Sequence, residues 1–217
     1  GIDPTLAHAP PIEWLTALMA TMGIECSTEP NLRLPTKVVE AIAERYQQHP
    51  PPRVVVALGG SHPAKDWPIR HWMQFMSALR ARMSGTIFVI GGPDHAEQAQ
   101  HLIASTQGTP TVNACDLTIL EAAALMRGAN LFVGPDSGPM NVAAAVGIPS
   151  FGLFGATRVL TYSKFINPIL PDDGSAATLD GMRRISPDQV LARIAPYLSA
   201  VNKDAASDGR AGVRRPP

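Results

Sequence analysis

The sequence predicts a three-layer α/β fold in which helices cover both faces of a parallel, Rossmann-like sheet. From residue 53 onward, short apolar runs alternate with longer segments of helical periodicity, which is the pattern of successive βαβ units. The apolar runs are continuous rather than alternating, as expected of parallel strands buried on both faces. Because crossovers between parallel strands are right-handed, these units should build one open sheet.

The region before the sheet is predicted to be helical. Residues 1–5 (GIDPT) resemble a cloning remnant, and residues 6–52 are expected to form inter-domain helices and a linker, with helices over 12–22 and 36–48. The triple proline at 50–52 ends this region, because proline neither continues a helix nor pairs within a central strand.

The Rossmann-like domain is assigned to residues 53–199. Its strands are expected at 53–58, 86–90, near 111–114, 130–134 and 150–154. Its helices are expected at 69–83, from the second strand's loop to about 105, and at 118–127, 137–146 and 187–198. Residues 200–217 are polar and unpatterned, which predicts a disordered tail.

The composition excludes several classes of function. Eighteen basic and eighteen acidic residues cancel, which argues against a nucleic-acid partner because such binding needs a net basic surface. No apolar run approaches the roughly 18 residues that a membrane span requires. Cys26 and Cys115 form no redox or zinc motif, which favours reduced thiols in a cytosolic protein without a bound metal.

Three loops that follow predicted strands have a composition suited to phosphate binding. They read GGSHPAKDWP, GGPDHAE and GPDSGPM, and they follow the first, second and fourth strands. Glycine allows close backbone approach, and the next helix directs its unpaired N–H groups toward the same place. In GPDSGPM, the amides of Ser137, Gly138 and Met140 could face an anion. The alternative is that Asp136 or Ser137 is an ordinary helix N-cap.

These segments carry a resemblance to a known family. GGSHPAKDWP, FVIGGPDHAEQAQ, the stretch from DLTILEAA to LFGAT, and ISPDQVLARIAPYL follow one another in the order and spacing of glycosyltransferase family nine. The similarity covers about residues 54–198 and resembles the carboxyl-terminal half of these heptosyltransferases, which build the inner core of bacterial lipopolysaccharide. It implies the donor domain of a GT-B glycosyltransferase, with nucleotide-sugar as the ligand of residues 53–199.

The resemblance also implies roles for individual residues. Lys65 would contact the donor phosphates, with Ser61 as a further phosphate hydrogen-bonding candidate. The amides that follow Asp136 would hold the distal phosphate, and the Asp136 carboxylate would meet sugar hydroxyls. Leu117 would line the base pocket, while Glu97, or else Asp94, would hold the ribose. Trp67 and Glu121 are expected to be structural.

Two departures from the family pattern affect the expected activity. Asn141 stands where the family has His after DSGPM, and an amide cannot carry the positive charge of an imidazolium. Nothing in the chain corresponds to the amino-terminal acceptor domain, which would supply the catalytic base. We therefore expect a fragment, or a protein that has lost its acceptor half, and no transferase activity from this chain alone.

The sequence-based hypothesis is the donor-binding half of an enzyme that transfers heptose from a nucleotide-activated donor, taken as ADP-heptose, to lipopolysaccharide core. No cofactor and no metal are expected. The lipopolysaccharide-type acceptor would bind through the missing domain. The location would be the cytoplasm, with peripheral contact at the inner face of the inner membrane. Two alternatives stay open: another GT-B enzyme, such as an epimerase or a transferase of a different sugar, and a catalytically inactive module that binds nucleotide-sugar or protein.

Overall fold

The computed structural model describes residues 11–27, 29–60, 62–105 and 110–211, and within them it contains one six-stranded parallel sheet. The strand order is β3-β2-β1-β4-β5-β6. The strands are β1 (Arg53–Ala57), β2 (Thr86–Ile90), β3 (Thr111–Asn113), β4 (Leu131–Pro135), β5 (Ser150–Leu153) and β6 (Ile166–Ile169). The prediction of a three-layer, Rossmann-like α/β fold is thus confirmed.

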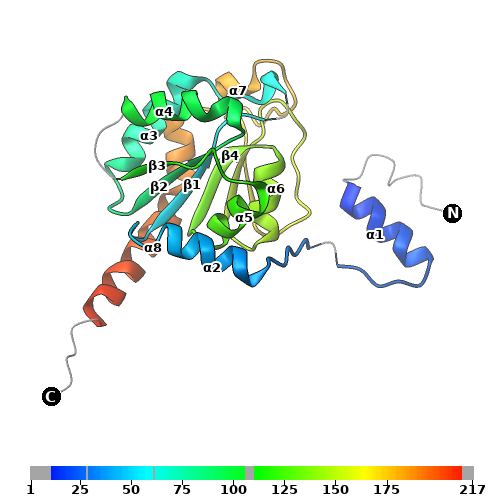
Figure 1. Cartoon of the computed structure of the whole chain (residues 1–217). Helices are drawn as coiled ribbons and strands as arrows, with labels where there is room; N and C mark the ends of the chain where they lie inside the picture. Colours follow the sequence, from blue (N-terminus) through cyan, green and yellow to red (C-terminus); the bar gives the residue numbers. More distant parts are fainter. Residues whose placement is uncertain (1–10, 28, 61, 106–109, 212–217) are drawn as a thin grey trace.

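Helices cover both faces of this sheet (Figure 1). Val54 and Val56 of β1 belong to a core shared with α3 (Ile69–Arg80), α4 (Ala96–Ala104) and α8 (Pro187–Ala211). Val55 and Ala57, which alternate with them, join the core under α2 (Thr36–Arg45), α5 (Ile119–Arg127) and α6 (Gly138–Ala145). Successive strand residues point to opposite faces, so a strand covered on both sides must be apolar throughout.

The two helices before the sheet differ in their relation to it. Helix α1 (Pro11–Thr21) lies apart from the sheet in Figure 1. Helix α2, grouped with the linker in the sequence analysis, packs against α5 and buries Ile42 and Tyr46 in the domain core. Arg53 closes the end of this region by donating hydrogen bonds to the carbonyl oxygens of Tyr46 and His49, at 2.9 to 3.1 Å.

Two elements escaped the sequence analysis. Strand β6 contains Pro168, which breaks the usual strand pattern but is tolerated because β6 lies at the edge of the sheet. The four-residue helix α7 (Gly181–Arg184) is too short to show a period. It approaches the loop after β5 closely, since a Cβ on Gly181 would lie 2.0 Å from the backbone oxygen of Gly155.

The carboxyl-terminal helix is longer than predicted. Helix α8 was expected to end at Leu198, with a disordered tail over 200–217, but it continues to Ala211. Extending an existing helix costs little because the unfavourable nucleation step is already complete. The polar composition of this segment therefore did not end the helix, and residues 212–217 lie outside the described part of the chain.

Candidate functional site

The candidate site lies where the strand order of the sheet reverses. After β1 the chain crosses to the face covered by α3, and after β4 it crosses to the opposite face, covered by α6. Because β1 and β4 are neighbours, their following loops diverge toward opposite faces at the carboxyl ends of the strands, and this switch point is called the crevice below. Ligands of open parallel sheets bind at such switch points, so the loops after β1 and β4 define the site.

Lys65 and Asp136 meet across this crevice. Lys65 ends the short helix η2 (Pro63–Lys65) after β1, and Asp136 follows β4, 71 residues later in the sequence. The Lys65 Nζ donates to the Asp136 carbonyl oxygen at 3.0 Å and lies 3.4 Å from the Asp136 Oδ2. Their side chains are only 23% and 12% exposed, so this ion pair is partly shielded from water. The contact joins two of the three loops that were predicted from sequence to bind phosphate, those after β1 and β4.

Local hydrogen bonds shape the loop that carries Lys65. The His62 side chain accepts a hydrogen bond from the Ala64 amide at 3.2 Å, which caps η2. The Asp66 carboxylate accepts one from the Gly60 amide at 3.1 Å. A Cβ on Gly60 would lie 2.9 Å from the Lys65 Cβ, so glycine is needed for the close turn that brings Lys65 back over the crevice. Ser61, the other candidate in this loop, lies outside the described residues.

The start of α6 is open in the way that an anion site requires. No side chain caps this helix, because the Ser137 hydroxyl donates to the Pro135 carbonyl oxygen at 3.2 Å instead. The alternative of an ordinary side-chain N-cap at Ser137 is therefore not realised. A Cβ on Gly138 would have no atom within 4 Å, so the first turn faces open space. The uncapped amides at the start of a helix attract anions through their N–H groups and the helix dipole.

Asn141, on the first turn and a half of α6, is fully engaged within the protein. Its Nδ2 donates to the Ser137 carbonyl oxygen at 3.1 Å, and its Oδ1 accepts a hydrogen bond from the Tyr162 hydroxyl. Burial raises the pKa of Tyr162, and the negative charges of Asp136 and Glu29 raise it further. Sequence reasoning missed Tyr162, because it lies in an irregular segment without any motif.

The loop after β2 lies beside the loop after β1. Its short helix η3 (Pro93–His95) places the His95 ring where a side chain at Gly59 would be, since a Cβ there would lie 2.0 Å from the His95 Nε2. Gly59 also has a φ of +69°, a conformation that favours glycine. Asp94 and Glu97 are both exposed on this loop and the first turn of α4. The structure thus places both ribose candidates one strand away from the Lys65 loop and two strands away from the Asp136 loop.

Leu117, the base-pocket candidate, is partly buried after β3 and packs against the core under α5. It lies three strands away from β4, so the predicted base and phosphate sites occupy different parts of the same edge.

Trp67 and Glu121, which were expected to be structural, both make contacts within the fold. Trp67 is 2% exposed and its Nε1 donates to the Ile185 carbonyl oxygen at 2.9 Å. Glu121 forms a capping box with Thr118 at the start of α5.

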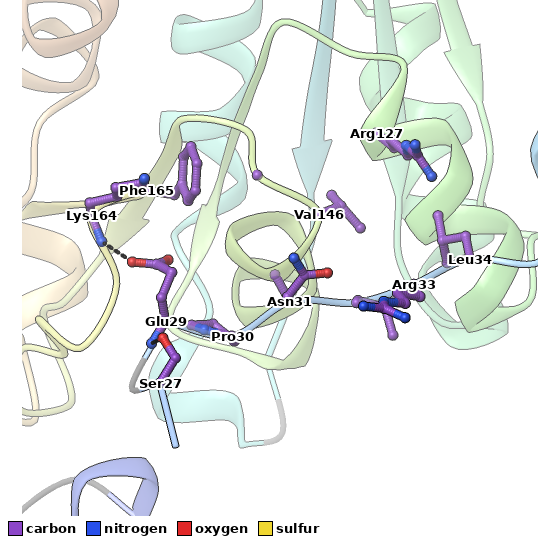
Figure 2. A pocket seen from close by; sticks show the side chains of 13 residues that line it. Ser27, Glu29, Pro30, Asn31, Arg33, Leu34, Arg127, Val146, Lys164 and Phe165 are labelled. Atoms are coloured by element: carbon purple, nitrogen blue, oxygen red, sulfur yellow. Dashed lines mark hydrogen bonds between the residues drawn. The ribbon is translucent and has the colours of Figure 1, made fainter. Parts of the chain in front are cut away.

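A cavity of about 800 Å³ lies at the opposite edge of the sheet, where the strands begin (Figure 2). It is lined by residue 27 and residues 29–34, by the carboxyl-terminal ends of α5 and α6, and by Lys164 and Phe165 before β6. Glu29 accepts a hydrogen bond from the Lys164 amide at 3.1 Å and another from the Ser163 hydroxyl. The hollow is thus separate from the Lys65–Asp136 crevice and includes none of the predicted site residues.

A family model described as glycosyltransferase family 9 (heptosyltransferase) matches residues 12–171, well over half of the chain. The chain belongs to glycosyltransferase family 9. Among curated proteins, it is 35% identical over 109 residues to lipopolysaccharide heptosyltransferase 3 of Escherichia coli. That match covers 49% of this chain and 32% of the relative, so the chain spans about a third of its length.

Solved structures of this family share the fold. A family 9 glycosyl transferase from Veillonella parvula aligns over 86% of this chain and 59% of its own, with a TM-score of 0.69 and 20% identity. The E. coli ADP-heptose lipopolysaccharide heptosyltransferase II aligns over 79% and 54%, with a TM-score of 0.64 and 20% identity. The E. coli heptosyltransferase WaaC, solved with ADP-2-deoxy-2-fluoro heptose, aligns over 88% and 57%, with a TM-score of 0.63 and 16% identity.

Metal-ligating clusters and membrane-spanning helices are both absent from the described residues. No group of three or more His, Cys, Asp or Glu side chains in this part of the chain could hold a metal ion. None of its helices combines the length and the apolar character that a membrane crossing demands.

Proposed function

We propose that this domain binds the nucleotide-sugar donor of a heptosyltransferase that transfers heptose from an ADP-activated donor to lipopolysaccharide core. The observation that carries the proposal is the pairing of Lys65 with Asp136 beside the uncapped start of α6. A lysine cation and a set of free amides at one switch point suit a diphosphate. The names of the curated relative and of two structural relatives support heptose and lipopolysaccharide as the sugar and the acceptor.

The chemistry proposed for the site is stabilisation of a leaving diphosphate. Transfer breaks the bond between the anomeric carbon of the donor and a diphosphate oxygen, which leaves with additional negative charge. Lys65 would exchange the Asp136 carboxylate for a phosphate oxygen, and the amides of Gly138 and Met140 would receive the distal phosphate. The Asp136 carboxylate would then be free for sugar hydroxyls. Preorganised donors of this kind stabilise developing charge without reorganisation, so neither metal nor cofactor enters this proposal.

We assign the acceptor site and the general base to the part of the relatives that this chain does not span. Alignments cover no more than 59% of the three structural relatives named above. A general base must lie within hydrogen-bond reach of the acceptor hydroxyl, and acceptor positioning supplies much of the rate. We therefore propose that this chain alone transfers no sugar, and that the whole enzyme works in the cytoplasm at the inner face of the inner membrane.

A thermal-shift screen of ADP, UDP and GDP tests the donor site. A ligand at about 100 times its dissociation constant stabilises the folded state by roughly 2.7 kcal/mol, and we expect ADP to do so. Absence of a shift for all three at millimolar concentration would refute the donor site. A larger shift for UDP than for ADP would preserve nucleotide-sugar binding but exclude the ADP-heptose assignment in favour of another GT-B enzyme.

A second candidate function is a nucleotide-sugar-binding module without transferase activity. The engagement of Asn141 by Ser137 and Tyr162 favours it, because this residue stands where the family has an ionisable His. Incubation with ADP-heptose and a truncated lipopolysaccharide acceptor tests both proposals. Product formed by this chain at about 1 per second or faster would place the catalytic base among its own residues and contradict the division between two halves.

A further inference from the structure

Tyr162 forms the outer end of a chain of hydrogen bonds that leads to the phosphate loop. Its hydroxyl faces the Asn141 Oδ1, and the Asn141 Nδ2 faces the Ser137 carbonyl oxygen at 3.1 Å. A carbonyl oxygen can only accept, so the Asn141 amide must turn its N–H toward Ser137 and its oxygen toward Tyr162. The Tyr162 hydroxyl is therefore the donor of the hydrogen bond to the Asn141 Oδ1. The direction of every bond in this chain is determined.

The Ser137 carbonyl belongs to the same peptide group as the Gly138 N–H. Peptide groups are planar and trans, so fixing the direction of the carbonyl also fixes the direction of the N–H on the other side of the plane. The Ser137 carbonyl oxygen receives the Asn141 Nδ2 at 3.1 Å and the Asn141 backbone N–H at 3.3 Å. Gly138 is the first residue of α6, it is exposed, and a Cβ there would have no atom within 4 Å. Asn141 thus orients an amide proposed to bind phosphate.

The segment that carries Tyr162 is itself anchored. The next residue, Ser163, is 4% exposed, and its hydroxyl donates to the Glu29 carboxylate. The Lys164 amide donates to the other carboxylate oxygen of Glu29 at 3.1 Å, as Figure 2 shows beside the cavity. Glu29 therefore anchors residues 163 and 164, which directly follow Tyr162. A tyrosine on an anchored segment can hold a partner in place, whereas one on a freely moving loop could not.

We propose that Tyr162 is a positioning residue of the donor site, which orients the Gly138 amide through Asn141 and Ser137. This inference rests on the proposed function, because the orientation matters only if a phosphate binds at α6. The Tyr162 hydroxyl donates its hydrogen bond to Asn141 and, in this proposal, does not touch the nucleotide-sugar. Its effect should therefore appear in the recognition of phosphate and not in the recognition of the nucleoside.

The test compares ADP with adenosine by titration calorimetry in Tyr162→Phe. Loss of one hydrogen bond, with the Asn141 oxygen left unsatisfied, should weaken ADP binding about five- to tenfold, and adenosine binding should not change. Tyr197→Phe is the matched control. The Tyr197 hydroxyl also donates to an asparagine oxygen, that of Asn167 at 3.4 Å, but on α8 and β6, away from the site. This control should leave both affinities unchanged.

A second variant separates positioning from general destabilisation. Asn141→Ala should weaken ADP binding at least as much as Tyr162→Phe, and adding Tyr162→Phe to it should cause no further loss, because Tyr162 acts through Asn141. The inference would be overturned if the variants lost as much affinity for adenosine as for ADP. It would also be overturned if the fold-losses in ADP affinity of the two single variants multiplied in the double variant. If the unchanged chain binds no ADP, the proposed function fails. If it binds ADP and Tyr162→Phe binds it equally well, only the positioning role fails.

Discussion

Basic side chains lie at both ends of the parallel strands, the carboxyl ends and the amino ends. Helix α6 begins at the first of these edges and ends at the second. At the carboxyl ends of the strands, α6 begins at Gly138 without a side-chain cap, and Lys65 lies across the crevice. At the other edge α6 ends, and its Ala145 carbonyl oxygen already accepts a hydrogen bond from the Leu32 amide at 2.9 Å. One end offers free donors, and the other has an acceptor that the preceding segment satisfies.

Helix polarity explains why similar charges have different roles at the two edges. Arg127 ends α5 and lines the 800 Å³ cavity together with Arg33 and Lys164. Cations are favoured near helix carboxyl termini, where the partial charge is negative, so these side chains complement the fold itself. Lys65 lies opposite a helix amino terminus, where the partial charge is positive and a cation gains nothing from the helix. The Asp136 carboxylate balances the charge of Lys65 there, and a phosphate bound at the start of α6 would take over this role.

The largest effect expected at the candidate edge is that of Lys65→Ala on ADP binding. Loss of a charge-assisted hydrogen bond to phosphate should cost about 1.5–3 kcal/mol, or roughly 10- to 100-fold in affinity, with adenosine binding unchanged. Lys164→Ala is the matched control at the opposite edge and should leave ADP binding as it is. Titration calorimetry measures all of these affinities. Equal losses for ADP and adenosine would make Lys65 a structural residue, and a loss in Lys164→Ala would remove the contrast between the edges.

The two cysteines differ in burial between the two ends of the strands, and the pH dependence of stability tests this difference. Cys26 is exposed in the segment before the cavity, whereas Cys115 is buried near the carboxyl end of β3, and burial raises the pKa of its thiol to about 11. The buried thiol stays protonated while the same thiol in the unfolded chain ionises around its ordinary pKa of 9.0. The contribution of the Cys115 thiol to the free energy of unfolding is therefore complete below pH 9. About 2 kcal/mol of it is lost as the pH rises toward 11.

Urea denaturation at pH 8 and at pH 11 measures this loss. Wild-type protein should lose more free energy of unfolding between the two pH values than Cys115→Ala, by about 2 kcal/mol, because other titrating groups cancel in the difference. Cys26→Ala should lose as much as wild type. The same pH dependence in Cys115→Ala and wild type would show that the Cys115 thiol titrates normally in the folded protein.

A smaller effect, of opposite sign, is expected for Asp136→Asn. The Asp136 carboxylate competes with phosphate for Lys65 and would repel the donor's negative charge. Its removal should hold or raise the affinity for ADP, by about two- to fivefold for an interaction worth about 0.5–1 kcal/mol at a partly exposed site. The affinity added by the sugar of ADP-heptose should fall. Calorimetry with ADP and ADP-heptose gives both values, and a loss of ADP affinity would mean that Asp136 shapes the loop instead.

The sequence by itself determined the fold class and most of its elements. Four of the six strands, β1, β2, β4 and β5, are mostly β-branched or apolar runs, as a strand buried on both faces requires. Glycine and proline mark the loops after the strands locally in the sequence. These loops could therefore be recognised as candidate sites, and with them Lys65, Asp136 and the amides after it. The resemblance to family 9 added their roles and is confirmed by the family match. The family match does not test the individual roles, so those of Lys65, Asp136 and the amides after it stay predictions, as do those of Ser61, Glu97, Leu117 and Asn141.

Tertiary structure alone decided which distant residues meet. Lys65 and Asp136 are 71 residues apart, and only the pairing of β1 with β4 brings their loops together. Tyr162 carries no local signal, because its importance comes from the Asn141 oxygen that it faces. Strand β6 pairs despite its proline because an edge strand needs hydrogen bonds on one side only. Local patterns encode the elements, but strand order and side-chain partners arise from burial and pairing summed over the whole chain, which a short stretch of sequence does not contain.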